Sequence, residues 1–109
     1  MTTTIFVAGA KDEEDYKRFM SIVGEAFPDC AIWRMDKIVK SLPERWTEDE
    51  ANEYMFNIIK NCTAFCTVDG WSKNEPRVGV YLNFARNHSV LVWTENGIKI
   101  SIKANANNQ

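Results

Sequence analysis

The stretch Asn61–Trp71 reads NCTAFCTVDGW, and it contains the segment that decides the fold. Within it, Ala64–Val68 is a continuous apolar run, which is typical of a strand buried on both faces of a sheet. Asp69 and Gly70 follow directly and form a strong turn signal. The stretch therefore predicts a short strand in the middle of a sheet, with a helix ending just before it at Asn61.

Similar segments alternate along the rest of the chain. Further strands are predicted at three short apolar segments: Thr3–Ala8, Cys30–Met35 and Ser89–Trp93. Helices are predicted where apolar residues recur at helical spacing: Asp12–Phe27, Thr47–Asn61 and Val78–Asn87. The second of these helices opens with a capping box formed by Thr47 and Glu50. Strands that alternate with helices indicate a mostly parallel sheet with right-handed crossovers.

The C-terminal part of the chain has a different pattern. Asn96 and Gly97 form a hairpin turn signal, and Ile98–Ile102 alternates apolar and polar residues, so we predict an antiparallel edge strand there. The expected fold is a three-layer α/β domain over residues 1–103, with about five strands and helices on both faces. The polar tail at residues 104–109 is expected to be disordered.

Two other features complete the fold prediction. Asp36–Trp46 has no clean period and contains a proline, so it is predicted to be a long surface loop with at most one helical turn. Trp33 and Trp93 lie within predicted strands and are expected in the core.

Composition excludes several classes of function. The chain has 109 residues, a net charge of −2 and a pI near 5.4, which argues against a nucleic-acid binder with a basic face. No apolar run approaches the roughly 20 residues that span a bilayer, and the N-terminal residues lack a basic region, so we expect a cytoplasmic protein with no membrane partner. Cys62, Cys66 and His88 are too few for a structural zinc site, so no metal or other cofactor is expected, and the three cysteines are expected to be free thiols.

The predicted topology places three loops around one crevice, because ligands of open parallel sheets bind outside the carboxyl ends of the strands. These loops are Ala8–Lys11, Arg34–Asp36 and Asp69–Arg77. In the first, Gly9 lets a ligand approach the backbone and Lys11 adds a cation, although an ordinary strand-to-helix turn explains the same residues.

The third loop reads DGWSKNEPR and combines an aromatic ring, two cations and hydrogen-bonding groups. Trp71 is suited to stacking on a base, Lys73 and Arg77 to meeting an anion, and Asp69 to accepting from sugar hydroxyls. The alternative is that Trp71 folds back onto the end of the sheet and the charges are solvated. His88 is interpreted as a helix-end residue.

Together these motifs resemble the nucleoside 2-deoxyribosyltransferase-like family, in particular its small phage-associated members of unassigned function. The family opens with a strand and a small-residue loop, continues with a Tyr-Met pair, a cysteine, a strand and a Gly-Trp loop, and ends with a helix and an apolar strand. The corresponding segments in this chain are Ile5–Ala10, Glu53–Met55, Asn61–Trp71 and Val80–Trp93. The resemblance implies a Rossmann-like or flavodoxin-like fold, a nucleoside-type ligand and a homo-oligomer.

One departure from the family concerns catalysis. The resemblance implies a glutamate nucleophile in the helix Val78–Asn87, but Tyr81 stands at that position, four residues before Ala85. The nearest carboxylates are Glu75 and Asp69, which precede the helix. A phenol is a poor substitute for a carboxylate, since its reference pKa is about 10.

The sequence therefore leaves three functions open. The first is a protein that binds a nucleotide- or nucleoside-derived ligand through Gly9, Lys11, Asp69, Trp71, Lys73 and Arg77, without the family's catalytic glutamate. The second is an N-glycosidic bond transferase or hydrolase that uses Glu75, Asp69 or, least favoured, Tyr81. The third is a non-enzymatic phage protein that inhibits a host protein in the host cytoplasm, with an apolar surface on Asp36–Trp46.

Overall fold

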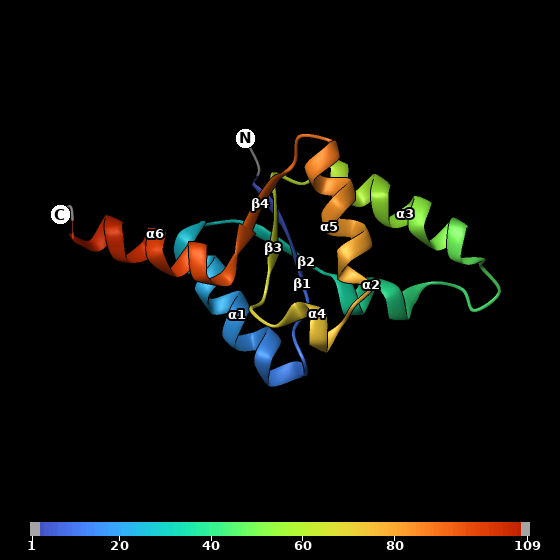
Figure 1. The fold of residues 1–109 in the computed structure, drawn as a ribbon, viewed down its shortest axis with the longest axis horizontal. Coiled ribbons are helices and arrows are strands. Elements are labelled where there is room, and N and C mark those ends of the chain that lie inside the picture. The colour runs from blue at the N-terminus through green and yellow to red at the C-terminus, as the bar shows by residue number, and fades with distance from the viewer. Residues whose placement is uncertain (1–2, 108–109) are drawn as a thin grey trace.

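The computed structural model describes residues 3–107 and contains one four-stranded sheet (Figure 1). Its strands are all parallel and lie in the order β2-β1-β3-β4. Their bounds are β1 Thr4–Ala8, β2 Ala31–Arg34, β3 Ala64–Thr67 and β4 Leu91–Thr94. The prediction of a parallel α/β sheet is confirmed, with four strands in place of about five.

Helices cover both faces of this sheet, as predicted. Their bounds are α1 Glu13–Ala26, α2 Met35–Ser41, α3 Glu48–Lys60, α4 Trp71–Asn74, α5 Val78–Asn87 and α6 Glu95–Asn107. In Figure 1, α1 and α6 lie on one side of the sheet, and α2, α3 and α5 lie on the other.

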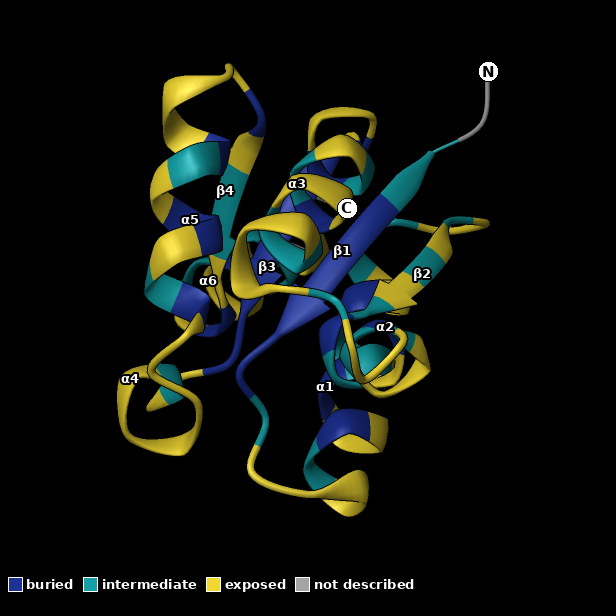
Figure 2. Ribbon diagram, turned by 90° about the vertical axis from the view of Figure 1, so that its right-hand side faces the viewer, coloured by how far each residue is buried: buried dark blue, intermediate teal, exposed yellow. Residues whose placement is uncertain are grey.

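The apolar side chains form one core cluster on each face of the sheet. On the α1–α6 face, Ile5 and Val7 pack with Phe19 and Ile98. On the α3–α5 face, Phe6 and Phe65 stack with ring centroids 5.1 Å apart and pack against both helices. The central strands β1 and β3 are thus buried from both sides, whereas the edge strands are partly exposed (Figure 2).

The predicted capping box at the start of α3 is present. The Thr47 side chain accepts a hydrogen bond from the Glu50 backbone N–H at 3.1 Å, and the Glu50 carboxylate accepts one from the Thr47 backbone N–H at 3.1 Å. Two backbone donors that the helix leaves unpaired are satisfied in this way. Asn61 ends the same helix, also as predicted.

Replacing Thr47 by alanine is expected to lower the free energy of unfolding by about 1 kcal/mol, since the capping hydroxyl is lost. Urea titration followed by circular dichroism measures this change. Ser72→Ala, at an exposed position, is the control and should leave stability within about 0.5 kcal/mol of the parent. Equal stability of the Thr47→Ala variant and the parent would contradict the capping role.

The prediction of a long loop after β2 was wrong for its first part. Met35–Ser41 forms the helix α2, which follows β2 without a connecting loop and buries Met35 and Ile38. Leu42, which precedes Pro43, adopts an extended conformation with ψ of 145°, and the helix ends there. The absence of a clear period reflects the shortness of this helix, which has seven residues.

The predicted C-terminal edge strand was also wrong, because this segment is the helix α6. The alternation Ile98, Ile100, Ile102 also places Ile98 and Ile102 four residues apart, on one helical face, where they belong to the core cluster beside α1. The Thr94 hydroxyl accepts a hydrogen bond from the Gly97 backbone N–H at 3.0 Å, as an N-cap does, so Asn96 and Gly97 begin a helix. The helix includes residues 104–107 of the predicted tail, and residues 108–109 lie outside the described range.

Trp33 is 47 % exposed, contrary to its predicted place in the core. It lies on β2, an edge strand, where it pairs in register with the buried Phe6 of β1. The helix that follows β2 is too short to cover the whole strand. Trp93, by contrast, packs against the core with its ring edge toward Phe27.

Candidate binding cavity

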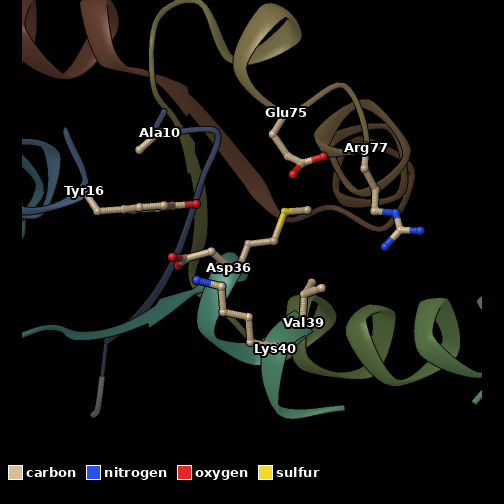
Figure 3. Close-up of a pocket in the computed structure, with 8 residues that line it drawn as sticks. Ala10, Tyr16, Asp36, Val39, Lys40, Glu75 and Arg77 are labelled. Atoms are coloured by element: carbon tan, nitrogen blue, oxygen red, sulfur yellow. The ribbon is translucent and has the colours of Figure 1, made fainter. Parts of the chain in front are cut away.

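A cavity of about 160 Å³ lies at the carboxyl ends of β1 and β2. We call it the Asp36 cavity. Its wall is formed by the loop after β1, by α1, by α2 and by the segment between α4 and α5. The lining residues are Ala10, Tyr16, Met35, Asp36, Val39, Lys40, Glu75 and Arg77 (Figure 3). This is the edge at which ligands of parallel α/β sheets bind.

A largely buried arginine, Arg34, holds the Asp36 carboxylate in place. Arg34 Nε donates to one oxygen of Asp36 at 3.0 Å, and Arg34 Nη2 donates to the other at 2.7 Å. The same Nη2 also donates to Glu13 at 2.6 Å. The Arg34 side chain is only 10 % exposed, so the pair is partly shielded from water. Asp36 therefore presents its remaining lone pairs to the cavity in a fixed orientation.

Tyr16 reaches the cavity from α1, with its hydroxyl pointing into the cavity in Figure 3. Its ring packs against the Arg34 guanidinium, whose central carbon lies 4.3 Å from the ring centroid. Burial and the negative charge of Asp36 raise the pKa of Tyr16 to about 12, while the backbone N–H groups of Gly9 and Ala10 act in the opposite direction. The phenol therefore stays protonated at neutral pH and can donate a hydrogen bond to a ligand.

The rest of the wall combines apolar surface with balanced charge. Met35 and Val39 supply the apolar part. Glu75 lies across the cavity from Asp36 in Figure 3, and Lys40 and Arg77 contribute two cations. Two carboxylates and two cations cancel, so the cavity has no net charge to attract a strongly charged ligand.

Of the residues predicted from the sequence, Arg77 and Glu75 line this cavity. Gly9 precedes Ala10 of the wall but is buried, and the Cβ and Cα of Trp71 occupy the space that a side chain at Gly9 would need. The Trp71 ring packs on Gly79, 3.5 Å from the position of a Cβ there, and belongs to the core cluster of the α3–α5 face. The structure thus places Trp71 at the end of the sheet and not on an open stacking face. Lys73 is exposed and outside the cavity wall.

The first loop has its own internal partners. Lys11 is exposed, and its backbone N–H donates to the Asp15 carboxylate at 3.1 Å. The Asp12 carboxylate accepts from the Asp15 backbone N–H at 2.8 Å. These contacts satisfy backbone N–H groups at the start of α1 within the chain itself.

The other two catalytic candidates lie away from the cavity. Tyr81 is fully buried between α5 and α3, where its hydroxyl donates to Asn52 Oδ1 at 2.9 Å and burial raises its pKa. The Asp69 backbone N–H donates to the Glu95 carboxylate at 3.1 Å. The side chain of Asp69 is not among the residues that line the cavity. His88 caps the end of α5 and stacks on Phe84, as its sequence position suggested.

Sequence reasoning placed Asp36 near the crevice but did not assign it a role, and it missed Tyr16 and Lys40. Tyr16 lies among the apolar positions of α1, where a tyrosine is indistinguishable from a core residue. The helical spacing of Asp36 and Lys40, four residues apart, was the available signal for a shared face. It was not used, since this segment was predicted to be a loop.

The segment proposed as an apolar docking surface folds onto the body of the protein. Ile38 is buried in the core and Val39 lines the cavity. Trp46 packs edge-on against Tyr54, with ring centroids 5.6 Å apart. Among residues 3–107, no group of three or more histidine, cysteine, aspartate or glutamate side chains is placed to hold a metal ion.

The fold and the cavity define a class: a parallel α/β domain, compatible with a Rossmann-like or flavodoxin-like arrangement, with a small mixed-charge cavity at the carboxyl edge of its sheet. Comparisons with protein-family models, with curated proteins and with solved structures give no match to this chain. No helix within residues 3–107 has the length and apolar character needed to cross a membrane.

Proposed function

We propose that this protein binds a nucleoside-derived ligand, with the sugar ring of the ligand in the Asp36 cavity. The observation that supports this most strongly is the pairing of a fixed carboxylate with a protonated phenol beside an apolar wall. Asp36 can accept hydrogen bonds from sugar hydroxyls and Tyr16 can donate one, while Met35 and Val39 can contact the carbon face of the ring.

The size of the cavity supports a ring-sized occupant. The cavity has a volume of about 160 Å³. Sites for whole drug-sized ligands are larger, about 300–1,000 Å³. A nucleoside would thus be enclosed only in part, with its base outside the cavity.

A thermal-shift screen against nucleosides, nucleotides and ADP-ribose-type compounds tests this proposal. A ligand that binds only the folded protein raises the melting temperature. For any compound that does so, Asp36→Asn is expected to weaken binding by about 10- to 100-fold, since hydrogen bonds to a charged group contribute roughly 1.5–3 kcal/mol. Asp49→Asn, on the exposed side of α3, is the control and should bind like the parent. The absence of a shift with every compound would reject the proposal for that set.

The second candidate is an enzyme that cleaves or transfers at an N-glycosidic bond. It is supported by the carboxylate of Glu75, which lines the same cavity as Asp36. In this case, product analysis of each bound nucleoside should detect free base, and Glu75→Gln should abolish its release without loss of binding. If the parent protein returns every bound nucleoside intact, the enzyme candidate is rejected and only the binding function is supported.

The resemblance to the deoxyribosyltransferase-like family also supports a homo-oligomer in the cytoplasm, of the host if the protein is encoded by a phage. Light scattering on the purified protein measures its mass directly. A mass equal to the 12.5 kDa chain would reject the oligomer.

A further inference from the structure

The helix pair α3 and α5 carries a second hollow, which is separate from the Asp36 cavity. Both helices lie on the face of the sheet opposite α1 and α6 (Figure 1). The hollow has a volume of about 330 Å³ and is lined by α3 and by the C-terminal end of α5. It shares no lining residue with the Asp36 cavity. We call it the α3–α5 groove.

Three stacked rings lie along this groove. Phe56 of α3 stacks on Phe84 of α5 with ring centroids 4.2 Å apart, and Phe84 stacks on His88 with centroids 3.9 Å apart. His88 Nδ1 donates to the Phe84 carbonyl at 2.9 Å, which fixes the imidazole ring in place. The two phenylalanines are only partly buried, and His88 is exposed. Aromatic residues are enriched in protein–protein interfaces relative to the rest of the surface, so this stack is suited to a protein partner.

The charged residues of the groove are sorted along α3. Asp49 and Glu53 line it near the start of the helix, and Lys60 lines it at the end. None of these three side chains forms an ion pair with another residue of the range 3–107. Asp49 and Glu53 are four residues apart on one helical face, where like charges repel. The acidic end and the basic end of the groove are thus each open to an opposite charge from another molecule.

The spacing of these charges fits a second copy of the same surface. Glu53 lies three residues before Phe56, and Lys60 lies four residues after it. Two copies of α3 that cross antiparallel at Phe56 place Glu53 of each copy opposite the partner's Lys60. A parallel arrangement would place like charges opposite one another. A two-fold symmetric interface requires a self-complementary surface of this kind.

We propose that the α3–α5 groove is a homodimer interface, in which α3 of one copy packs antiparallel against α3 of the other across a two-fold axis near Phe56. The stacked rings form the apolar centre, and two pairs of Glu53 with Lys60 flank it. This interface rests on the proposed homo-oligomer and adds the surface and the orientation of the two copies. Because the groove and the Asp36 cavity share no lining residue, dimer formation and ligand binding can be tested separately.

Charge reversal tests the pairing of Glu53 with Lys60. Sedimentation equilibrium of the parent should give a mass of about twice the 12.5 kDa of one chain. Glu53→Lys and Lys60→Glu should each raise the dissociation constant of the dimer by about tenfold, because the two-fold axis brings the like charges together twice. The variant that combines both reversals should regain most of the lost affinity. Lys103→Glu, at an exposed position of α6, is the control and should dimerise like the parent.

A cross-link tests the position of the two-fold axis. Asn57 is exposed and adjacent to Phe56, so the two copies of this residue lie close together in the proposed dimer. Asn57→Cys should give a disulfide-linked dimer on a non-reducing gel after oxidation by air with a copper catalyst. Asp49→Cys, on the same helix but far from the axis, should not exceed the background of the parent, which has three cysteines of its own.

The outcomes separate the interface from the other proposals. Weaker association of both single reversals, with recovery in the combined variant, supports the α3–α5 interface. An oligomer that neither single reversal weakens, or that the combined variant does not restore, rejects this interface and keeps the homo-oligomer. A parent that stays monomeric at every concentration rejects both, while the ligand screen still decides the binding function.

Discussion

Replacing Gly9 by alanine is expected to lower the free energy of unfolding by about 3 kcal/mol. Gly9 has φ of +93°, a conformation that costs roughly 1–3 kcal/mol for residues with a Cβ. The added methyl would also overlap the Cβ of Trp71 and lie 3.2 Å from its Cα. Neither atom can move aside unless the main chain of Trp71 moves as well. Overpacking of this kind costs a further 1–3 kcal/mol or so. Denaturant unfolding measures the combined cost of the backbone strain and the overpacking.

Gly24→Ala is the matched control for this change, and its expected effect has the opposite sign. Gly24 lies within α1, and a Cβ at this position would meet nothing within 4 Å. Alanine in place of glycine within a helix is expected to stabilise the protein by about 0.5–1 kcal/mol. If both variants changed stability in the same direction and by similar amounts, the close approach of Trp71 to Gly9 would not be the cause.

The second large effect is expected at Glu95, which is 3 % exposed and joins three parts of the fold. Its carboxylate accepts from Arg18 of α1 at 2.6 Å, from Lys99 at 2.8 Å and from the Asp69 backbone N–H after β3 at 3.1 Å. Breaking a buried ion pair costs about 3–5 kcal/mol, but the Arg18 side chain is 43 % exposed and keeps part of its hydration. We therefore expect Glu95→Gln to cost about 2 kcal/mol, or roughly 8–16 °C in melting temperature.

The same carboxylate makes the stability depend on pH. The hydrogen bond from Arg18 is the largest cause that lowers the pKa of Glu95 from 4.5 to about 2. A lowered pKa means that the unfolded chain takes up the proton first, so this stabilisation is present above pH 4.5 and is lost as the pH falls toward 2.

Melting curves between pH 2 and pH 6 measure this contribution. The parent should lose stability more steeply than Glu95→Gln over the lower part of this range. Glu14→Gln, at a carboxylate whose side chain is 87 % exposed, should follow the parent. Identical pH profiles for the parent and Glu95→Gln would show that Glu95 is not the group that titrates.

The cavity could be located from the sequence, but its composition could not. The carboxyl ends of parallel strands meet at one edge, so the segments that follow β1, β2 and β3 were expected to converge, and residues of the loop after β1, of α2 and of the segment before α5 line the cavity. The contribution of Tyr16 depends on how α1 lies across the end of β1, and the contribution of Lys40 depends on a helix where a loop was expected. The first is a tertiary outcome that no local pattern in this chain encodes, and the second was signalled only by the four-residue spacing of Asp36 and Lys40, which puts them on one face only if the segment is a helix.

The sequence by itself determined those strands and helices whose local pattern fits only one kind of structure. The apolar run at β3 can be satisfied only in the middle of a sheet, and the capping box of Thr47 and Glu50 satisfies backbone donors within one helical turn. Where a pattern fits both the two-residue period of a strand and the spacing of a helix, only the tertiary structure decided which of the two forms. The isoleucines of α6 alternate as in a strand but also recur every four residues, and the burial of Glu95 beside Arg18 together with the packing of Ile98 on the α1 face stabilises the helix.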